Sequence, residues 1–261
     1  MSTYKTIFVK DAEGVRTIIL NRPKSLNALN YDVINELLDV FNLTKLDNQV
    51  RVVVLKGEGR SFCAGDDLKG MGTETRPAPN HALRRAELGY SRLISALREL
   101  DKPVLAQVHG HALGAGCDLA IACDLVYADN NTQFGLVFAK RGLVAGTALL
   151  PRLVSYQKSC QYLFTGETFS AEQAKNMGIV NEVYESNDLS FEVEKKACEF
   201  SKAPTAAIGL MKRAINESLG KSLKDSLKIQ NSVIAHSYNT YDYEEGKKAF
   251  NEKRKPQYIG E

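Results

Sequence analysis

Phe62-Cys63-Ala64-Gly65-Asp66-Asp67-Leu68 and Gly110-His111-Ala112-Leu113-Gly114-Ala115-Gly116-Cys117-Asp118 are two glycine-rich turns, each joining an apolar, strand-like run to a helix-like segment. Small residues let backbone N–H groups approach a ligand, and the first N–H groups of a helix are unpaired and lie at the positive end of its dipole. Two such ends directed at one carbonyl oxygen would stabilise the charge of an enolate. Each turn alone also fits an ordinary strand-to-helix connection. Together they predict an oxyanion hole.

Strand-like and helix-like segments alternate around these turns. β-Branched or apolar runs predict strands at 17–20, 52–55, 104–108 and 125–128, and helical spacing of apolar residues predicts helices at 31–41 and from about 113 to 122. Repeated strand–helix units predict an α/β core with parallel strands. Composition alone would suggest a doubly wound sheet.

From about Glu192 onward the strand signals stop and helix formers dominate. Helices are predicted over 193–201, 205–219 and 222–238, with apolar residues at three- and four-residue steps. Such a group of helices has too small a core to be stable alone. We therefore expect it to pack against the rest of the chain or against another copy.

The bulk composition is that of an ordinary globular protein. The chain has 261 residues, of which 44% are hydrophobic and 25% are charged. A chain of this length and hydrophobic content can bury a large core, and its composition argues against a disordered protein. Its net charge of +3, from 34 basic and 31 acidic residues, is too balanced to imply nucleic acid. The basic cluster at 253–255 could bind a small anion such as a CoA phosphate.

Cysteine usage and targeting signals point to the cytoplasm. The five cysteines are an odd number without Cys-x-x-Cys spacing, so we expect reduced, mostly buried thiols. The N-terminal residues lack a long apolar stretch, no membrane span is present, and Ile259-Gly260-Glu261 is no peroxisomal signal. No metal-ligand spacing and no Gly-x-Ser-x-Gly motif occur, so neither a metal site nor a serine hydrolase is expected.

Motifs spread over nearly the whole chain resemble the crotonase, or enoyl-CoA hydratase/isomerase, superfamily. Besides the two turns, they include Leu20-Asn21-Arg22-Pro23-Lys24-Ser25-Leu26-Asn27-Ala28-Leu29, Leu150-Pro151-Arg152-Leu153 and Gly178-Ile179-Val180-Asn181. The resemblance implies an α/β fold with the crotonase-like ββα spiral. It implies an acyl-CoA-binding core over 1–193 and a C-terminal helical region over 194–261 that forms homotrimers, often paired into homohexamers.

The resemblance also assigns site residues. The oxyanion donors would be the main-chain N–H groups of Asp66 and Ala115, with the Asp66 side chain directed to solvent or capping the next turn. Substrate contacts would come from eight further residues, and no cofactor beyond the coenzyme A thioester substrate is implied. These eight residues are Lys24, Ser25, Leu26, Ala64, Gly114, Phe138, Phe250 and Lys253.

Asp118 occupies the position of the first of two catalytic glutamates in family hydratases. It lies three residues beyond Ala115, about one helical turn along the same side. Its carboxylate could transfer protons, or it could cap the first turn of the helix and complement the dipole. Aspartate is one methylene shorter than glutamate, which bears on its reach.

The second catalytic carboxylate is missing. Phe138 stands at the position of the second glutamate, and the run from Gly142 to Arg152 is about three residues shorter than the pattern that carries an acid in another branch of the family. Lys140 and Arg141 flank this run and could balance an acidic acyl group or be solvated. His81, His109, His111 and Tyr90 are the remaining side chains that could take part, and we interpret them as structural or surface residues.

The sequence thus predicts an acyl-CoA enzyme of the enoyl-CoA hydratase/isomerase type, a lyase or isomerase of fatty acid metabolism, that stabilises a thioester enolate. Simple hydration needs one group to activate water and one to protonate the α-carbon. Because both usual places for the second group are empty, an acyl-CoA thioesterase or decarboxylase, or a non-catalytic acyl-CoA-binding protein, remains an alternative.

Overall fold

The computed structural model describes residues 4–73 and 76–261 and has a six-stranded sheet at its centre. Its strands, in spatial order, are β1 (Ile7–Ala12), β2 (Val15–Leu20), β3 (Val52–Gly57), β4 (Val104–Val108), β6 (Leu125–Asp129) and β9 (Glu182–Tyr184). β1 and β2 form an antiparallel hairpin, and each later pair in this order is parallel. The β3 run is almost fully buried, as expected for a parallel sheet with both faces covered.

A second sheet has three short strands, β5 (His111–Leu113), β7 (Gln133–Gly135) and β8 (Phe169–Ser170). β5 pairs in parallel with β7, and β7 pairs in antiparallel with β8. The prediction of a helix from about Leu113 is wrong by two residues. Gly114 has φ 52° and ψ −124°, which no helical residue adopts, so the helix α4 (Ala115–Ala122) begins only after it.

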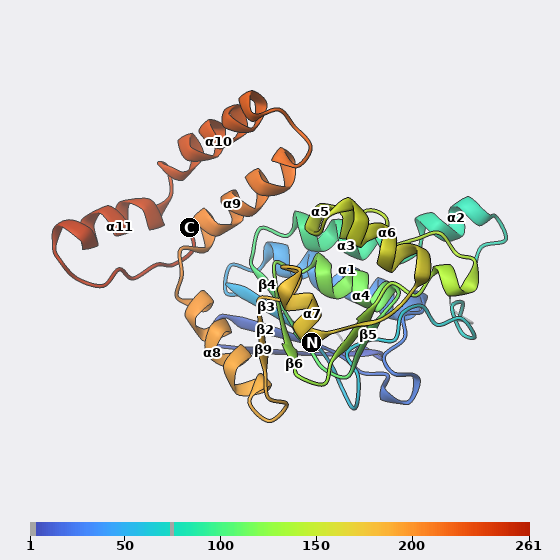
Figure 1. The fold of residues 1–261 in the computed structure, drawn as a ribbon. Coiled ribbons are helices and arrows are strands. Elements are labelled where there is room, and N and C mark those ends of the chain that lie inside the picture. Colours follow the sequence, from blue (N-terminus) through green and yellow to red (C-terminus); the bar gives the residue numbers. More distant parts are fainter. Residues whose placement is uncertain (1–3, 74–75) are drawn as a thin grey trace.

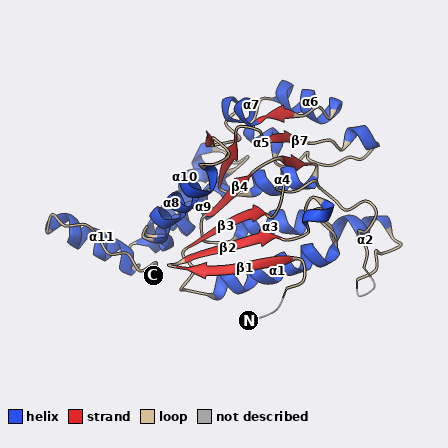
Figure 2. Cartoon of the chain, turned by 90° about the horizontal axis from the view of Figure 1, so that it is seen from below, coloured by secondary structure: helices blue, strands red, loops and turns tan. Residues whose placement is uncertain are grey.

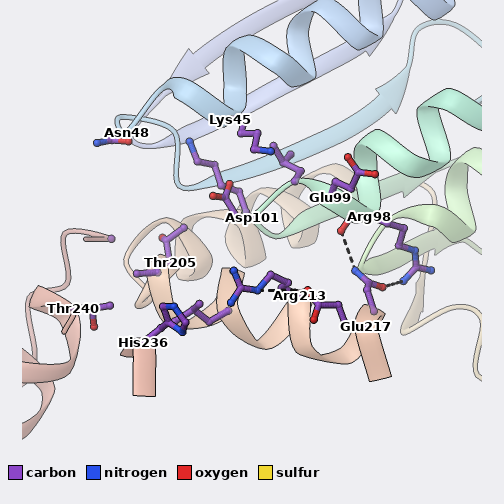
Figure 3. A pocket seen from close by; sticks show the side chains of 17 residues that line it. Lys45, Asn48, Arg98, Glu99, Asp101, Thr205, Arg213, Glu217, His236 and Thr240 are labelled. Atoms are coloured by element: carbon purple, nitrogen blue, oxygen red, sulfur yellow. Dashed lines mark hydrogen bonds and ion pairs between the residues drawn. The ribbon is translucent and has the colours of Figure 1, made fainter. Parts of the chain in front are cut away.

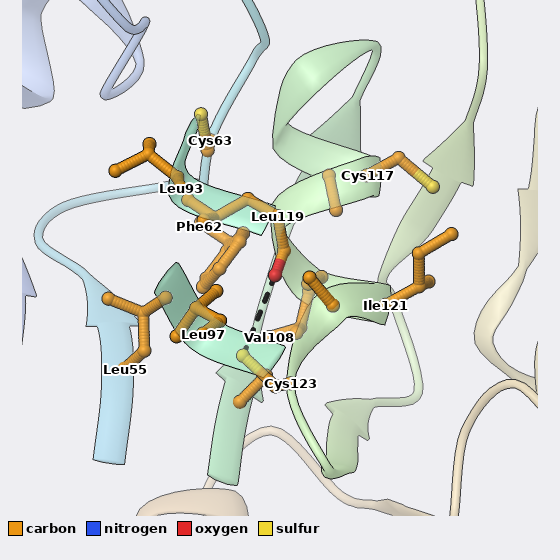
Figure 4. Packing of buried hydrophobic residues seen from close by; sticks show 14 of the residues in the cluster. Leu55, Phe62, Cys63, Leu93, Leu97, Val108, Cys117, Leu119, Ile121 and Cys123 are labelled. Atoms are coloured by element: carbon orange, nitrogen blue, oxygen red, sulfur yellow. Dashed lines mark hydrogen bonds between the residues drawn. The ribbon is translucent and has the colours of Figure 1, made fainter. Parts of the chain in front are cut away.

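Helices cover both faces of the large sheet (Figure 1). On one face of the sheet, the apolar residues of α1 (Tyr31–Leu46), α3 (Ser91–Glu99) and α4 are buried in the main core. On the other face, α8 (Leu189–Ser201) packs through Leu189, Val193 and Ala197. Figure 4 shows Leu93 and Leu97 of α3 against Leu119 of α4. The helix that holds the second glycine-rich turn is therefore fixed in the core.

Short elements connect the strands at the edge that carries the turns (Figure 2). They are η1 (Pro23–Ser25), α2 (Ala82–Glu87), η2 (Ala139–Arg141), α5 (Leu150–Leu153), α6 (Tyr156–Thr165) and α7 (Ala171–Asn176).

Three C-terminal helices, α9 (Thr205–Ser218), α10 (Leu223–Ser237) and α11 (Tyr241–Asn251), form an arm that projects from the core (Figure 1). The arm exposes large apolar side chains, among them Met211 (61%), Leu223 (76%) and Phe250 (83%). The sequence predicted the first two helices but not α11, which begins where the Thr240 hydroxyl accepts a hydrogen bond from the Tyr243 N–H (3.1 Å).

Within the described residues, none of the helices combines the length and the apolar character needed to cross a bilayer. Residues 1–3, which contributed to the expectation that no export signal is present, lie outside the described part of the chain.

Candidate functional site

The first turn, residues 62–68, is held in place by backbone hydrogen bonds to two other segments. The Cys63 N–H donates to the His111 carbonyl (3.0 Å), and the Ala64 N–H donates to the Leu26 carbonyl (2.9 Å). Gly65 has φ +100°, a conformation that other residues rarely adopt. The turn therefore presents Asp66 at a fixed place, next to both β5 and the loop that contains η1.

The second turn follows β5 and begins α4. The Leu113 N–H donates to the Cys63 carbonyl (3.0 Å), so the two turns are hydrogen-bonded to each other. Gly116, in the first turn of α4, has no room for a side chain, because a methyl group there would lie 2.3 Å from the Cys63 carbonyl oxygen. Glycine is needed at this position so that the backbones can approach closely.

The Asp66 and Ala115 N–H groups lie close together. A methyl group on Gly65 would lie 3.4 Å from the Ala115 nitrogen, which places the two turns in contact at this point. Within the described part of the chain, neither the Asp66 N–H nor the Ala115 N–H donates to a protein acceptor. Ala115 is fully buried and is the first residue of a helix, so its N–H is an unused donor at the positive end of a dipole.

A small cavity of about 20 Å³ is lined by Asp66 and Ala115, the two residues that carry these N–H groups. The predicted site residues Ala64, Gly114 and Phe138 line it as well. The rest of the lining consists of Gly65, Leu68, Val137, Arg141 and Leu143, of which the Leu68 and Leu143 side chains are exposed. Sequence reasoning thus brought together five residues that the fold places around one cavity.

Asp118 lies in the first turn of α4 and is only 2% exposed. Its Oδ2 accepts a hydrogen bond from the Tyr90 hydroxyl (2.8 Å), and its Oδ1 has no partner among the described residues. Burial raises the pKa of Asp118 to about 6, and the Asp66 charge raises it too, whereas the Tyr90 hydrogen bond lowers it. A carboxyl group with a pKa near neutral is suited to acid–base work.

The Asp66 side chain does not simply point to solvent or cap the next turn, as the sequence suggested. Its Oδ1 is buried and has no hydrogen-bond partner in the described part of the chain, and burial raises the pKa of Asp66 to about 6. A buried polar atom without a partner is costly, so such atoms often mark sites that receive a ligand. Asp67, by contrast, pairs with Arg22 at 2.8 Å.

Tyr90 and Phe138 form an aromatic pair beside these carboxyl groups. Their ring centroids are 6.2 Å apart and their planes differ by 9°, so the rings are stacked. The interpretation of Tyr90 as a structural or surface residue misses its hydrogen bond to Asp118. Tyr90 is the residue before α3 and is 28 residues from Asp118 in sequence, so no spacing could have signalled the contact.

The residues expected to bind the CoA moiety fall into two groups. Lys24, Ser25 and Leu26 lie in η1 and at its end, next to Ala64. Phe250 lies on α11 and Lys253 just after it, on the projecting arm (Figure 1). Within one copy of the chain, the arm residues are therefore not brought to the cavity.

His109 and His111 both make contacts within the fold. His109 hydrogen-bonds through Nε2 to the Gly59 carbonyl (2.8 Å), and His111 contacts the Ser61 hydroxyl (3.3 Å). His81 is exposed at the start of α2. Among the described residues, no group of three His, Cys, Asp or Glu side chains is arranged to hold a metal ion.

A cavity of about 600 Å³ lies elsewhere, between the arm and the core (Figure 3). It is lined by side chains of both charges, including Arg98, Arg213, Glu217 and His236, and by none of the predicted site residues. This cavity is thus separate from the one around the two turns.

Comparisons with known proteins give a consistent result. The family model described as enoyl-CoA hydratase/isomerase matches residues 10–261. The chain is 35% identical to 1,2-epoxyphenylacetyl-CoA isomerase of Escherichia coli (strain K12), covering 95% of this chain and 96% of the relative. It is 33% identical to crotonyl-CoA hydratase of Syntrophomonas wolfei, covering 98% of each.

Solved structures agree with the sequence relatives. Enoyl-CoA hydratase from Mycobacterium smegmatis superposes with a TM-score of 0.88 at 32% identity, covering 97% of this chain and 99% of that one. Enoyl-CoA hydratase from Bacillus anthracis gives 0.89 at 30% identity, covering 98% and 100%. These matches confirm the expected crotonase-like α/β fold with its C-terminal helical region.

Proposed function

Because this chain belongs to the enoyl-CoA hydratase/isomerase family and is an acyl-CoA enzyme of that type, we propose that its reaction runs through a thioester enolate held between the Asp66 and Ala115 N–H groups. The observation that carries this proposal is the pair of unused backbone donors beside one cavity. Preorganised donors at the position where charge develops lower the barrier most effectively. The relatives favour this reaction type over the thioesterase, decarboxylase and non-catalytic alternatives.

We assign proton transfer to Asp118, which does not itself line the cavity but is hydrogen-bonded to Tyr90, whose ring stacks on Phe138 of the lining. It is buried, has one unpartnered oxygen among the described residues and has a pKa of about 6, so it can both accept and release a proton. A helix cap would use that oxygen on backbone N–H groups, and among the described residues no N–H donates to it. These features support a role in catalysis over a role as a cap.

The CoA moiety would be bound by η1 of one copy and by the arm of another. Lys24, Ser25 and Leu26 would line the adenine side, and the Ala64 carbonyl would accept a hydrogen bond from the ligand. Phe250 is 83% exposed on an apolar arm, which supports burial against a neighbouring copy. We therefore include a homotrimer or homohexamer in the proposal, with Phe250 and Lys253 reaching a neighbour's CoA.

We also propose that the enzyme is cytoplasmic and needs no cofactor besides its substrate. All five cysteines are free, and three of them, Cys63, Cys117 and Cys123, are buried. Burial raises the pKa of each of these three thiols, so they stay protonated and unreactive. Reduced cysteines of this kind are typical of cytoplasmic proteins.

The proposed function is tested by incubating the purified protein with a panel of enoyl-, malonyl- and aryl-CoA thioesters and following the products by mass. We expect addition of water or movement of a double bond in at least one enoyl thioester. Release of free CoA or of CO₂ without either change would contradict the proposal and favour a thioesterase or a decarboxylase.

A further inference from the structure

The proposed function leaves one chemical need unmet, because a double-bond shift or a hydration needs two proton transfers at different atoms. Asp118 accounts for one of them. Phe138 cannot supply the other, since a phenyl ring has no exchangeable proton. One carboxylate can carry out both transfers in turn, whereas a second carrier would come from a part of the site that neither family position for the carboxylate indicates.

Asp66 has the properties of that second carrier. Its main-chain N–H is one of the two proposed oxyanion donors. The carboxyl group of the same residue is therefore close to the place where the thioester would bind. Its Oδ1 is buried and unpartnered in the described part of the chain, as is the Oδ1 of Asp118. Asp66 and Phe138 line the same cavity. Tyr90 stacks on Phe138 and donates a hydrogen bond to Asp118, which connects all three polar groups to this part of the site.

The geometry points to a catalytic pair in which Asp118 is the base and Asp66 is the acid, with Tyr90 as the positioning residue that holds Asp118. This inference rests on the enolate reaction proposed above and assigns its two proton transfers. Two carboxyl groups that are close together and poorly hydrated share one proton more readily than both ionise.

The hydrogen bonds decide which member carries the charge. The Tyr90 hydroxyl donates to Asp118 Oδ2 at 2.8 Å, which favours the ionised form of Asp118. Asp66 has no such donor among the described residues, and burial alone raises its pKa. When the pair holds one proton, the hydrogen bond from Tyr90 therefore places the charge on Asp118 and the proton on Asp66.

The other titratable groups around the pair do not compete for this proton. Burial raises the pKa of the Cys63 thiol to about 12, and burial also raises the pKa of the Cys117 thiol, so both stay neutral. The pKa of Tyr90 is raised by burial and by Asp118, so it remains a donor. Arg141 lines the cavity and is itself exposed.

The step balances for a β,γ-unsaturated acyl thioester. Asp118 removes a proton from the α-carbon, and the electron pair of that C–H bond enters the dienolate, whose oxygen accepts hydrogen bonds from the two backbone N–H groups. Asp66 then gives its proton to the γ-carbon, which forms the α,β double bond and restores the carbonyl. Transfer of one proton from Asp118 to Asp66 resets the pair.

Two probes separate the roles of the two carboxyl groups. In D₂O, exchange of the α-hydrogens of phenylacetyl-CoA needs only the base, whereas conversion of 3-butenoyl-CoA to crotonyl-CoA needs both groups. We expect Asp118→Asn to lose both reactions. Asp66→Asn should retain α-exchange and lose isomerisation by roughly 10² to 10⁴-fold, the range of one acid–base group, while Asp66→Glu recovers part of it.

Tyr90→Phe and Asp67→Asn serve as the comparison variants. Tyr90→Phe should lower kcat with little change in KM and move the Asp118 limb of the pH profile upward, because the hydrogen bond that favours ionised Asp118 is lost. Asp67→Asn changes the neighbouring carboxylate, which pairs with Arg22, and should leave the shape of the pH profile unchanged.

A titration independent of turnover tests the pairing directly. With ¹³C-labelled aspartate carboxyls followed by NMR, Asp118→Asn should move the Asp66 midpoint downward by roughly one pH unit, because a neighbouring negative charge is removed. Independent midpoints, or equal loss of exchange and isomerisation in Asp66→Asn, would overturn the pair. If the pair were overturned in this way but Ala115→Pro greatly reduced turnover, the proposal of an enolate reaction would remain. A wild-type protein that is inactive on every probe would overturn both the enolate reaction and the catalytic pair.

Discussion

Gly116 and Cys63 touch through their backbones, because a methyl group on Gly116 would lie 2.3 Å from the Cys63 carbonyl oxygen. The helix that begins at Ala115 and the turn that carries Asp66 are therefore separated by no side chain. The spacing of the two N–H donors depends on this contact. Any added atom between them has to push one turn away from the other.

Gly116→Ala should therefore reduce activity more than it reduces stability. We expect the free energy of unfolding to fall by about 1–3 kcal/mol, the usual cost of overpacking, and turnover of the folded protein to fall by at least tenfold. Chemical denaturation and steady-state kinetics measure the two effects. Gly209→Ala is a matched control, since a methyl group there meets the Asp101 carbonyl oxygen at the same 2.3 Å, far from the cavity. Equal kinetic losses in both variants would contradict the argument.

Ala115→Pro removes one oxyanion donor with little change to the helix, because proline is well tolerated at the first helical position. We expect the barrier to rise by about 3 kcal/mol or more, which lowers turnover by roughly 100-fold or more. Ala115→Ser, which keeps the N–H, is the control. Circular dichroism establishes that both variants are folded, and full activity in folded Ala115→Pro would refute the hole.

Crotonyl-CoA hydration should be slow in the wild type, by roughly 10² to 10⁴-fold relative to a two-glutamate relative. By resemblance to the family, Phe138 occupies the position at which such relatives carry a carboxylate. The Phe138 side chain is only 6% exposed and stacks on the Tyr90 ring. Phe138→Glu tests whether the pocket kept its geometry. A gain in hydration would show that only the group was lost, and no gain would indicate a pocket shaped for a different acyl chain. A wild type that hydrates at hundreds per second would contradict this prediction.

The buried carboxyl group of Asp118 makes stability depend on pH in a definite direction. Its pKa in the folded protein, about 6, is above its ordinary value of 3.8, so its favourable contribution is complete below about pH 4 and is lost as the pH rises through about 6. Asp118→Asn cannot ionise. Its stability relative to the wild type should therefore improve by about 1–3 kcal/mol between pH 4 and pH 8, as measured by urea unfolding. For Asp67, whose pKa is lowered, the favourable contribution is present above about pH 4 and is lost at lower pH, so Asp67→Asn should show little change between pH 4 and pH 8.

The exposed apolar arm predicts assembly. Light scattering at micromolar concentration should give a trimer or hexamer, and Phe250→Ala should raise KM for the CoA thioester with little effect on kcat. A stable monomer would count against both the assembly and the shared CoA site. Lys158→Ala, on α6 of the core, is a surface control that should leave KM unchanged.

The sequence indicated the parts of this site that are local in the chain. The two turns, with Ala64, Asp66, Gly114 and Ala115, could be predicted, because small residues at a strand-to-helix junction allow backbone N–H groups to approach a ligand. The short strand β5 was missed because three residues carry too little periodicity to separate a strand from the start of a helix. α11 was missed because its mixed polar sequence has a weak apolar pattern.

The acid–base cluster could not be predicted, because its members are distant in sequence. Asp66, Tyr90 and Asp118 come from three segments, and only tertiary packing buries Asp118 and brings Tyr90 to it. One signal was present: a carboxylate at position 66, where the oxyanion hole needs only a backbone N–H, is a costly choice for a buried turn. That cost is the physical reason to look for a use of the side chain.

In the proposed mechanism, Asp66 stabilises charge through its main-chain N–H and delivers a proton through its side chain. A single codon change at this position can therefore remove proton delivery and keep the N–H donor. A substitution there can change the reaction while the amide stays where the fold holds it. A library randomised at positions 66, 118 and 138 would therefore vary the groups that transfer protons while the backbone donors for the enolate stay in place. A site built in this way can acquire a new reaction through single substitutions.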